Sequence, residues 1–118
     1  MTTILAVALG GGVGTALRYI IAAPLNDRSP GFGTAVVNVA GSLVLGVLLG
    51  WFSTRSGNSV LRIALGAGVL GGFTTFSAWS VELVDSLDRP GRLLVLLVGP
   101  VVLGLAAAWI GIRIGRAV

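Results

Sequence analysis

Long uncharged stretches divide the chain into four parts, and the charged residues are concentrated in the short segments between them. The four stretches are residues 1–17, 29–54, 63–81 and 93–112. Three of them have about the 20 residues that a helix needs to cross a bilayer, and the first reaches that length if it continues past Arg18. The pattern predicts an all-α integral membrane protein with four transmembrane helices, at residues 3–23, 31–53, 61–84 and 92–113.

The composition agrees with a membrane location and leaves no room for a separate soluble domain. Of the 118 residues, 55 % are hydrophobic and 10 % are charged, and the mean hydropathy is +1.01. We therefore expect one four-helix membrane domain over residues 1–118. The chain has no cysteine or histidine, and all eight basic residues are arginines. Thiolate ligands, the usual proton shuttle and a reactive lysine are thus excluded, and an enzyme is not expected.

The arginines bear on how the helices are oriented. With four spans, one side of the membrane holds Arg55, Arg62, Arg113 and Arg116, and the other holds Arg28, Arg89 and Arg92, with Arg18 near the end of the first helix. Because the two sides are nearly balanced, the positive-inside rule gives almost no preferred orientation. A chain that inserts both ways can pair with its inverted copy, so we expect an antiparallel dual-topology dimer. The arginines form no stripe that would follow a nucleic-acid backbone, and no nucleic-acid partner is expected.

Glycines recur at four-residue spacing in every predicted span. The pairs are Gly10/Gly14, Gly46/Gly50, Gly68/Gly72 and Gly111/Gly115. Such pairs allow two helix backbones to approach closely in lipid. Chance is the alternative explanation, since the chain contains 19 glycines. Close packing is favoured because each span has a pair.

Several polar residues fall at membrane depth in the first two predicted helices. Arg18 either extends from the helix end to the membrane surface or provides a positive charge that attracts anions to a hydrated vestibule. In the second helix Thr34, Asn38 and Ser42 recur every four residues and so share one face. An asparagine in hydrocarbon must either bond to another helix or face a hydrated cavity. The pattern leaves both possibilities open.

The stretch "GGFTTFSAW", residues 71–79, combines glycine and threonine inside an apolar run. These residues weaken a helix, so we expect the third helix to be broken near mid-membrane. Carbonyl groups freed by a break are hard oxygen ligands that suit a small cation. Beyond the break, Phe76, Trp79 and Ser80 share one face, where the positive edges of aromatic rings can favour an anion. An ordinary aromatic packing stripe is the alternative.

Three motifs resemble those of the Fluc/CrcB family of fluoride channels, and the resemblance covers essentially the whole chain. They are "GGGVGTALRY" at residues 10–19, "GTAVVNVAGSLVLG" at 33–46 and "GGFTTFS" at 71–77. The last is the most specific, since it corresponds to the helix-break signature of the family. The resemblance implies a passive, fluoride-specific channel that exports fluoride across the plasma membrane of a prokaryote and so reduces its toxicity.

The same resemblance implies roles for individual residues. The backbone carbonyls of Gly71 and Thr74, from both chains of the dimer, would bind one central structural sodium ion. Asn38 would donate its amide N–H to passing fluoride, and Phe76 and Trp79 occupy the two aromatic positions, the second of which is usually phenylalanine. Ser80 or Thr75 would add hydroxyl donors. For Trp79 itself two outcomes are open: its indole N–H joins the pathway, or its bulk narrows the pore. We expect the N–H to face the ion, because a buried indole N–H usually finds a partner.

The fourth predicted helix departs from the family pattern. Where a tyrosine and serines usually form a polar track, this chain has Leu96, Pro100 and Gly104. The departure favours an alternative in which the chain is one subunit of a heterodimeric channel and does not conduct alone, whereas the balanced arginines favour a homodimer. A small multidrug-type exporter subunit is a further alternative, but it normally needs a glutamate in the first helix, and the only glutamate here is Glu82.

Overall fold

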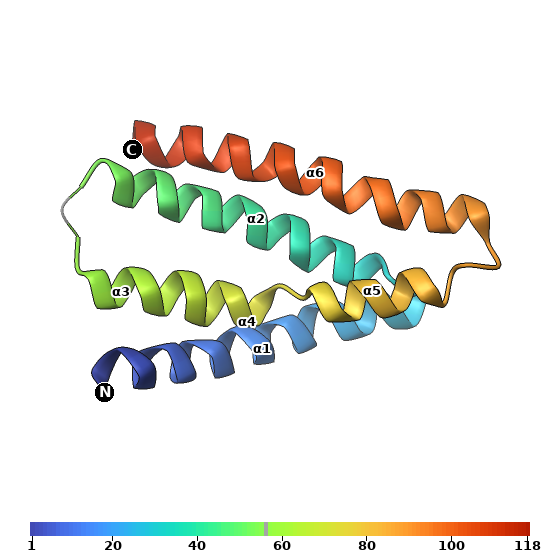
Figure 1. Cartoon of the computed structure of the whole chain (residues 1–118), viewed down its shortest axis with the longest axis horizontal. Helices are drawn as coiled ribbons and strands as arrows, with labels where there is room; N and C mark the ends of the chain where they lie inside the picture. Colours follow the sequence, from blue (N-terminus) through green and yellow to red (C-terminus); the bar gives the residue numbers. More distant parts are fainter. Residues whose placement is uncertain (56) are drawn as a thin grey trace.

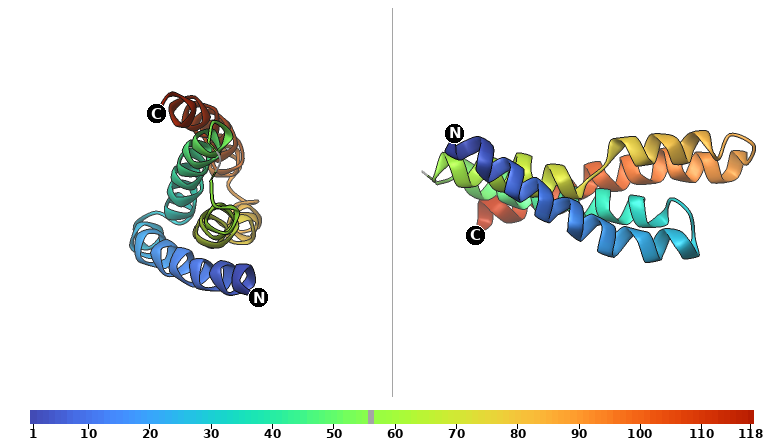
Figure 2. Two further views of the ribbon diagram at one scale, coloured as in Figure 1. Left: turned by 90° about the vertical axis from the view of Figure 1, so that its left-hand side faces the viewer. Right: turned by 90° about the horizontal axis from the view of Figure 1, so that it is seen from below.

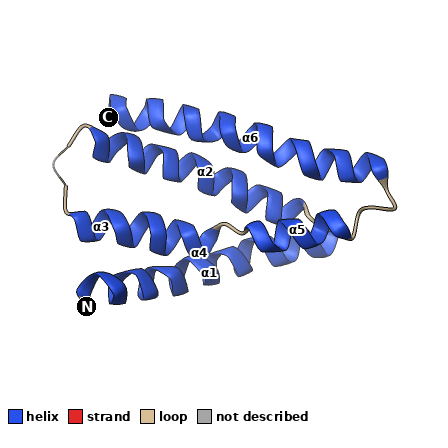
Figure 3. Cartoon of the chain, in the orientation of Figure 1, coloured by secondary structure: helices blue, strands red, loops and turns tan. Residues whose placement is uncertain are grey.

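The computed structural model describes residues 1–55 and 57–118, and all of its regular structure in those residues is helical (Figures 1 and 3). Four segments are long and apolar enough to cross a membrane, namely Thr2–Arg28, Phe32–Ser53, Ser59–Val84 and Pro90–Ala117. The predicted all-helical chain with four spans is confirmed at this level. In order, the elements are α1 (Thr2–Arg28), α2 (Phe32–Ser53), α3 (Ser59–Ile63), the π-helix η1 (Ala64–Leu70), α4 (Gly71–Phe73), α5 (Phe76–Val84) and α6 (Pro90–Ala117).

The connections between the helices follow from local sequence. Gly31 has φ 86°, the one positive φ in the described residues, and this conformation reverses the chain between α1 and α2. The side chain of Asn58 caps α3 by accepting hydrogen bonds from the backbone N–H groups of Val60 and Leu61, at 2.9 and 3.2 Å. Pro90 begins α6 at a position where its missing N–H costs nothing.

The helices form an elongated bundle with extents of 49 × 30 × 19 Å. The fourth span, α6, packs along α2, and α1 packs against η1, α4 and α2. In the end-on view of Figure 2, α1 and α6 lie at opposite edges of the bundle. Both chain termini lie at the same end, as expected for an even number of crossings (Figure 1).

Large apolar side chains cover the outside of the bundle. Leu9, Val95 and Leu105 are 73 %, 68 % and 69 % exposed, and only 6 % of the most apolar window of the first span is buried. A chain with so much outward apolar surface would aggregate in water. In a bilayer the same surface contacts lipid, and the helices satisfy their own backbone hydrogen bonds.

Glycines bring the helix backbones together, which confirms the predicted close packing. A Cβ atom added to Gly46 or Gly50 of α2 would collide with the backbone of α6, and one added to Gly111 or Gly115 would collide with the backbone of α2. On the other side of the bundle, a Cβ on Gly10 would lie 2.7 Å from the carbonyl oxygen of Ala64. The two interfaces therefore depend on the absence of side chains at these positions.

The structure also contains a feature that the glycine spacing does not predict. Residues Ala64–Leu70 form a π-helix, and the N–H of Gly71 bonds to the carbonyl of Gly66 five residues earlier. Gly68, within this segment, lies so close to α1 that an added Cβ would be 3.0 Å from the carbonyl oxygen of Val7. Wide turns of this kind are frequent at functional sites. Here the π-helix directly precedes the polar region of the third span.

We predict that Gly14→Ala destabilises the protein while Gly12→Ala does not. The added methyl at position 14 would meet the backbone carbonyl of Val69, whereas position 12 has no atom within 4 Å in the described structure. Overpacking costs about 1–3 kcal/mol. The measurement is the thermal unfolding midpoint of the purified variants in detergent. Equal midpoints for the two variants would contradict the close contact of α1 with η1.

Candidate functional site

The backbone leaves the helical conformation at two residues of the third span. Thr74 has ψ 159° and Thr75 has φ −151° and ψ 117°, both extended, and together they form the short loop between α4 and α5 in Figure 3. We call these two residues the interruption. The N–H of Thr75, which a continuous helix would donate to Gly71, is donated to Asn38. The N–H of Ala78, which would serve Thr74, is capped by the Thr75 hydroxyl at 3.2 Å. The interruption therefore removes the helical donors of the Gly71 and Thr74 carbonyls.

The side chain of Asn38 holds the interruption in place from α2. Its Oδ1 accepts the N–H of Thr75 at 2.7 Å, and its Nδ2 donates to the carbonyl of Thr75 at 2.9 Å. The amide thus pairs with both backbone polar groups of one residue, Thr75, as a residue of a neighbouring strand would. A carboxylate or an aliphatic residue cannot make both bonds. Since Nδ2 carries two hydrogens, one N–H of Asn38 remains for another acceptor.

Arg18 approaches the same segment from α1. Its Nη1 donates to the carbonyl oxygen of Thr74 at 3.1 Å, so its guanidinium lies at the interruption and does not extend to the membrane surface. A charged donor at a carbonyl that has lost its helical partner is a favourable pairing in a low-dielectric region. The interruption therefore has a side chain on each flank, Arg18 from α1 and Asn38 from α2.

Two cavities whose mostly apolar linings include polar side chains meet at Thr75. The larger, about 650 Å³, is lined by Arg18, Tyr19 and Ser77 among others, and the smaller, about 280 Å³, by Asn38, Ser42 and the two aromatic residues of α5. Thr75 lines both. We refer to them as the arginine cavity and the asparagine cavity.

The aromatic residues lie on the asparagine cavity. Phe76 is 75 % exposed, and its ring centroid is 5.4 Å from that of Trp79 at an interplanar angle of 55°. Both rings line the asparagine cavity, and their edges carry partial positive charge. The indole N–H of Trp79 points elsewhere: Nε1 donates to the carbonyl of Leu96 in α6 at 2.7 Å.

The hydroxyl groups of α2, α5 and the interruption already take part in hydrogen bonds within the protein. Ser80 donates to the carbonyl of Phe76 at 2.9 Å within α5, and Ser42 donates to the carbonyl of Asn38 at 2.8 Å within α2. The Thr75 and Ser77 hydroxyls lie 3.2 Å apart, and one of them donates to the other. The Ser80 and Ser42 hydrogens therefore serve protein acceptors, whereas one hydrogen of the Thr75–Ser77 pair has no acceptor among the described residues.

Thr34 does not join Asn38 and Ser42 at one cavity. It is 2 % exposed, and its hydroxyl donates to Oε1 of Glu82 at 2.6 Å and accepts from Asn26 at 3.2 Å. This polar cluster links α1, α2 and α5 beside the arginine cavity. The spacing of residues along α2 could not reveal it, because Asn26 and Glu82 come from other helices. The one hint of this cluster in the sequence is Glu82, an acidic residue at the end of an apolar span.

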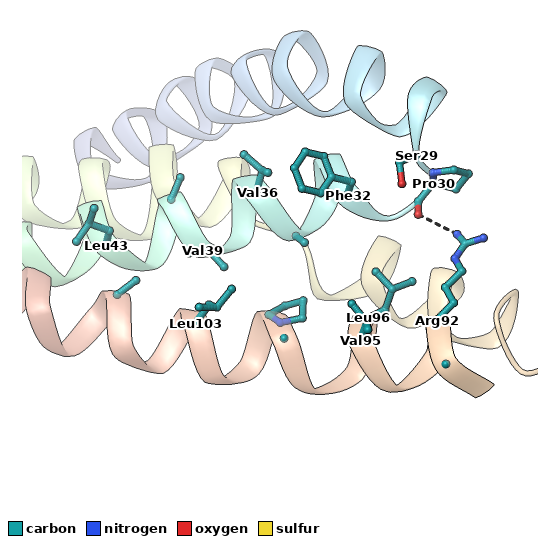
Figure 4. Close-up of a pocket in the computed structure, with 16 residues that line it drawn as sticks. Ser29, Pro30, Phe32, Val36, Val39, Leu43, Arg92, Val95, Leu96 and Leu103 are labelled. Carbon is teal, nitrogen blue, oxygen red and sulfur yellow. Dashed lines mark hydrogen bonds between the residues drawn. The ribbon is translucent and has the colours of Figure 1, made fainter. Parts of the chain in front are cut away.

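A third cavity is larger than these two and different in character. It is an apolar groove of about 830 Å³ along α2 and α6, with Val36, Val39 and Leu103 among its lining residues (Figure 4). At its polar end, Arg92 donates to the carbonyl of Pro30 at 2.8 Å. Of the fourth-helix positions that depart from the polar pattern, Leu96 and Pro100 line this groove. The groove has the character of a lipid-facing or helix-facing surface and not of a polar pathway.

The carbonyl oxygens at the interruption are ligands that suit a small hard cation better than a transition metal. Among the described residues, no group of three or more acidic, histidine or cysteine side chains forms a metal site. The carbonyls of Gly71 and Thr74 lack their helical donors, and carbonyl oxygens are ligands of hard cations. The oxygen of Thr74 also accepts from Arg18, so a cation there would share that carbonyl with a guanidinium.

Fold and site together define a small multi-pass membrane protein with polar side chains gathered around an interrupted helical segment. A family model described as "CrcB-like protein, Camphor Resistance (CrcB)" matches residues 5–112. The fluoride-specific ion channel FluC of Novosphingobium aromaticivorans is 43 % identical over an alignment of 127 positions, which covers 100 % of this chain and 99 % of the relative. The channels of the same name from Methylobacterium sp. (strain 4-46) and Paracoccus denitrificans are 40 % and 41 % identical. These two alignments cover 98 % and 97 % of this chain, and 98 % and 94 % of the relatives.

The chain therefore belongs to the CrcB family, whose relatives here are named as ion channels and not as enzymes. The predicted family is confirmed, and so is the prediction that the protein is not an enzyme.

Proposed function

We propose that the protein is the subunit of a passive, fluoride-specific channel that exports fluoride from the cytoplasm across the plasma membrane of a prokaryote. The full-length similarity to channels of that name supports the chemical class. The observation that carries the proposal is the Asn38 amide, which holds Thr75 and keeps one N–H beside a small cavity lined by aromatic rings.

Fluoride is small and strongly hydrated, so a pathway must replace its water with donors and yet bind it weakly enough to release it. The spare N–H of Asn38 is a neutral donor, and the ring edges of Phe76 and Trp79 add partial positive charge without a full cation. On the other side of Thr75, Arg18 places a fixed positive charge that attracts anions into the arginine cavity. The Thr75 and Ser80 hydroxyls contribute donors if they exchange their present partners for the ion.

We propose further that two copies pair in opposite orientations. Thr74 lies 15 residues after Ser59 and 10 before Val84, so the interruption is placed near the middle of this span. Two antiparallel copies would bring their interruptions to the same depth. The balance of arginines on the two sides supports insertion in both orientations. The asparagine cavity is open in one chain, and a second copy would provide the missing wall.

A structural sodium ion fits this arrangement. The Gly71 and Thr74 carbonyls of both copies would hold it, and the ion would supply a fixed positive centre that keeps the two interruptions together. The sodium is structural and is not transported in this proposal.

A heterodimeric channel is a second candidate, favoured by the fourth helix. At the positions where hydroxyl donors are expected, Leu96 and Pro100 have apolar side chains and Gly104 has none. In that case a paralogous chain would supply the donors. Reconstitution of this chain alone distinguishes the two candidates.

We predict that the purified chain alone, in liposomes, releases fluoride and retains chloride. Once a second copy closes the asparagine cavity, its neutral donors can replace the water around a small anion but not around the larger chloride. The measurement is anion efflux detected with fluoride and chloride electrodes. Vesicles that stay silent until a paralogous chain is added would support the heterodimer, and vesicles that release both anions equally would contradict a fluoride-specific pathway.

We predict that Asn38→Asp lowers fluoride efflux by at least about tenfold. A carboxylate has no donor for the ion or for the Thr75 carbonyl, and its charge repels an anion at low dielectric. The matched control is Asn58→Asp, which keeps the acceptor that caps α3 far from the cavity. Thermal unfolding in detergent separates loss of conduction from loss of fold. Normal efflux through Asn38→Asp would show that Asn38 serves only to hold Thr75.

We predict that replacing sodium with a large organic cation lowers the thermal stability of the dimer. The Gly71 and Thr74 carbonyls would then face each other without a cation between them. The measurement is the fraction of dimer that survives heating, at equal ionic strength with each cation. Identical curves in the two buffers would remove the sodium ion from the proposal.

A further inference from the structure

Pro100 leaves a backbone carbonyl of α6 without its usual partner. In an α-helix the carbonyl of residue 96 accepts the N–H of residue 100, but proline has no N–H. The indole of Trp79 supplies the missing donor: Nε1 lies 2.7 Å from the carbonyl oxygen of Leu96. A side chain of α5 thus completes the backbone hydrogen bonding of α6.

The surroundings give this bond its importance. Leu96 is 8 % exposed and lines the apolar groove together with Pro100 (Figure 4), and Trp79 is the side-chain donor that its carbonyl has in the described residues. Burial of an unpartnered carbonyl is costly, and in lipid no water is at hand to satisfy it. Elsewhere α5 touches α6 only lightly, so the bond is a principal link between the two helices.

The same indole lies on the asparagine cavity. Its ring lies beside the ring of Phe76 at a tilt of 55°, and both line the space that Asn38 borders. A bond that fixes the indole to α6 therefore also fixes the orientation of the aromatic edges at this cavity. Phenylalanine at position 79 would keep a ring but release it from α6.

We infer that Trp79 is a positioning residue coupled to Pro100: its N–H serves the Leu96 carbonyl and not the ion, and the bond sets the aromatic geometry that selects the anion. The effect on selectivity rests on the proposed channel function, whereas the coupling of the two residues does not. The N–H expected to face the ion has a structural partner instead.

The test compares four chains: wild type, Trp79→Phe, Pro100→Ala and the double variant. Alanine at position 100 restores an N–H for Leu96, so the indole is no longer needed. We expect Trp79→Phe to lower the thermal midpoint clearly when Pro100 is present and little when it is introduced together with Pro100→Ala. We expect the fluoride-to-chloride efflux ratio to fall several-fold in Trp79→Phe and to stay low in the double variant, because phenylalanine has no bond to α6 in either chain. Trp109→Phe, which alters an indole that is 61 % exposed, is the matched control.

The fluoride-to-chloride efflux ratio separates positioning from a purely structural role. Loss of folded protein alone would lower both fluxes and leave the ratio unchanged, and that result would overturn the positioning role. If the N–H served the ion and not Leu96, Trp79→Phe would lower the thermal midpoint equally with and without Pro100→Ala, and the inference would fail. A wild-type chain that passes no fluoride would count against the proposed function, while the stability comparison would still decide the coupling of Trp79 with Pro100.

Discussion

Backbone hydrogen bonding is the constraint on which this structure depends. In hydrocarbon every peptide group needs a partner from the protein, so a helix that stops at Thr74 must find new partners for several groups at once. Asn38 pairs with both polar groups of Thr75, the Thr75 hydroxyl caps Ala78, and Arg18 donates to Thr74. The polar residues at membrane depth therefore stabilise the helix break in the absence of any ion. The proposed pathway uses the hydrogen-bonding groups that these contacts leave free.

Close packing makes these pairings possible. Side chains as short as asparagine reach a neighbouring helix only when the backbones are near, and the glycine contacts provide that proximity along α1 and α2. The same principle applies in α6, where Pro100 leaves the carbonyl of Leu96 without a backbone donor and the indole N–H of Trp79 takes that place. Helix breaks and small residues thus belong to one arrangement: tight interfaces bring donors from one span to orphaned acceptors in another.

The four spans and the close helix packing could be predicted from the sequence, whereas the partners of individual polar side chains could not, for physical reasons. Uncharged runs determine the four spans because membrane thickness sets helix length. Spacing identified the glycine interfaces and the importance of Asn38. It could not say that Asn38 pairs with Thr75, that Thr34 turns away toward Glu82, or that the indole of Trp79 meets Leu96, because these partners lie on different helices. The π-helix before Gly71 was not predicted either, because the spacing of its residues does not distinguish it from an α-helix.

The position of the chain ends has a consequence for how such a protein can be built and duplicated. Both termini lie at one end of the bundle, because four crossings return the chain to its starting side (Figure 1). Two copies that point in opposite directions would have their termini on opposite faces of the membrane. No surface loop, however long, can join the last residue of one to the first residue of the other. A single polypeptide containing both copies would need an additional membrane-crossing helix as its linker, so the parity of the fold restricts which gene fusions preserve the assembly.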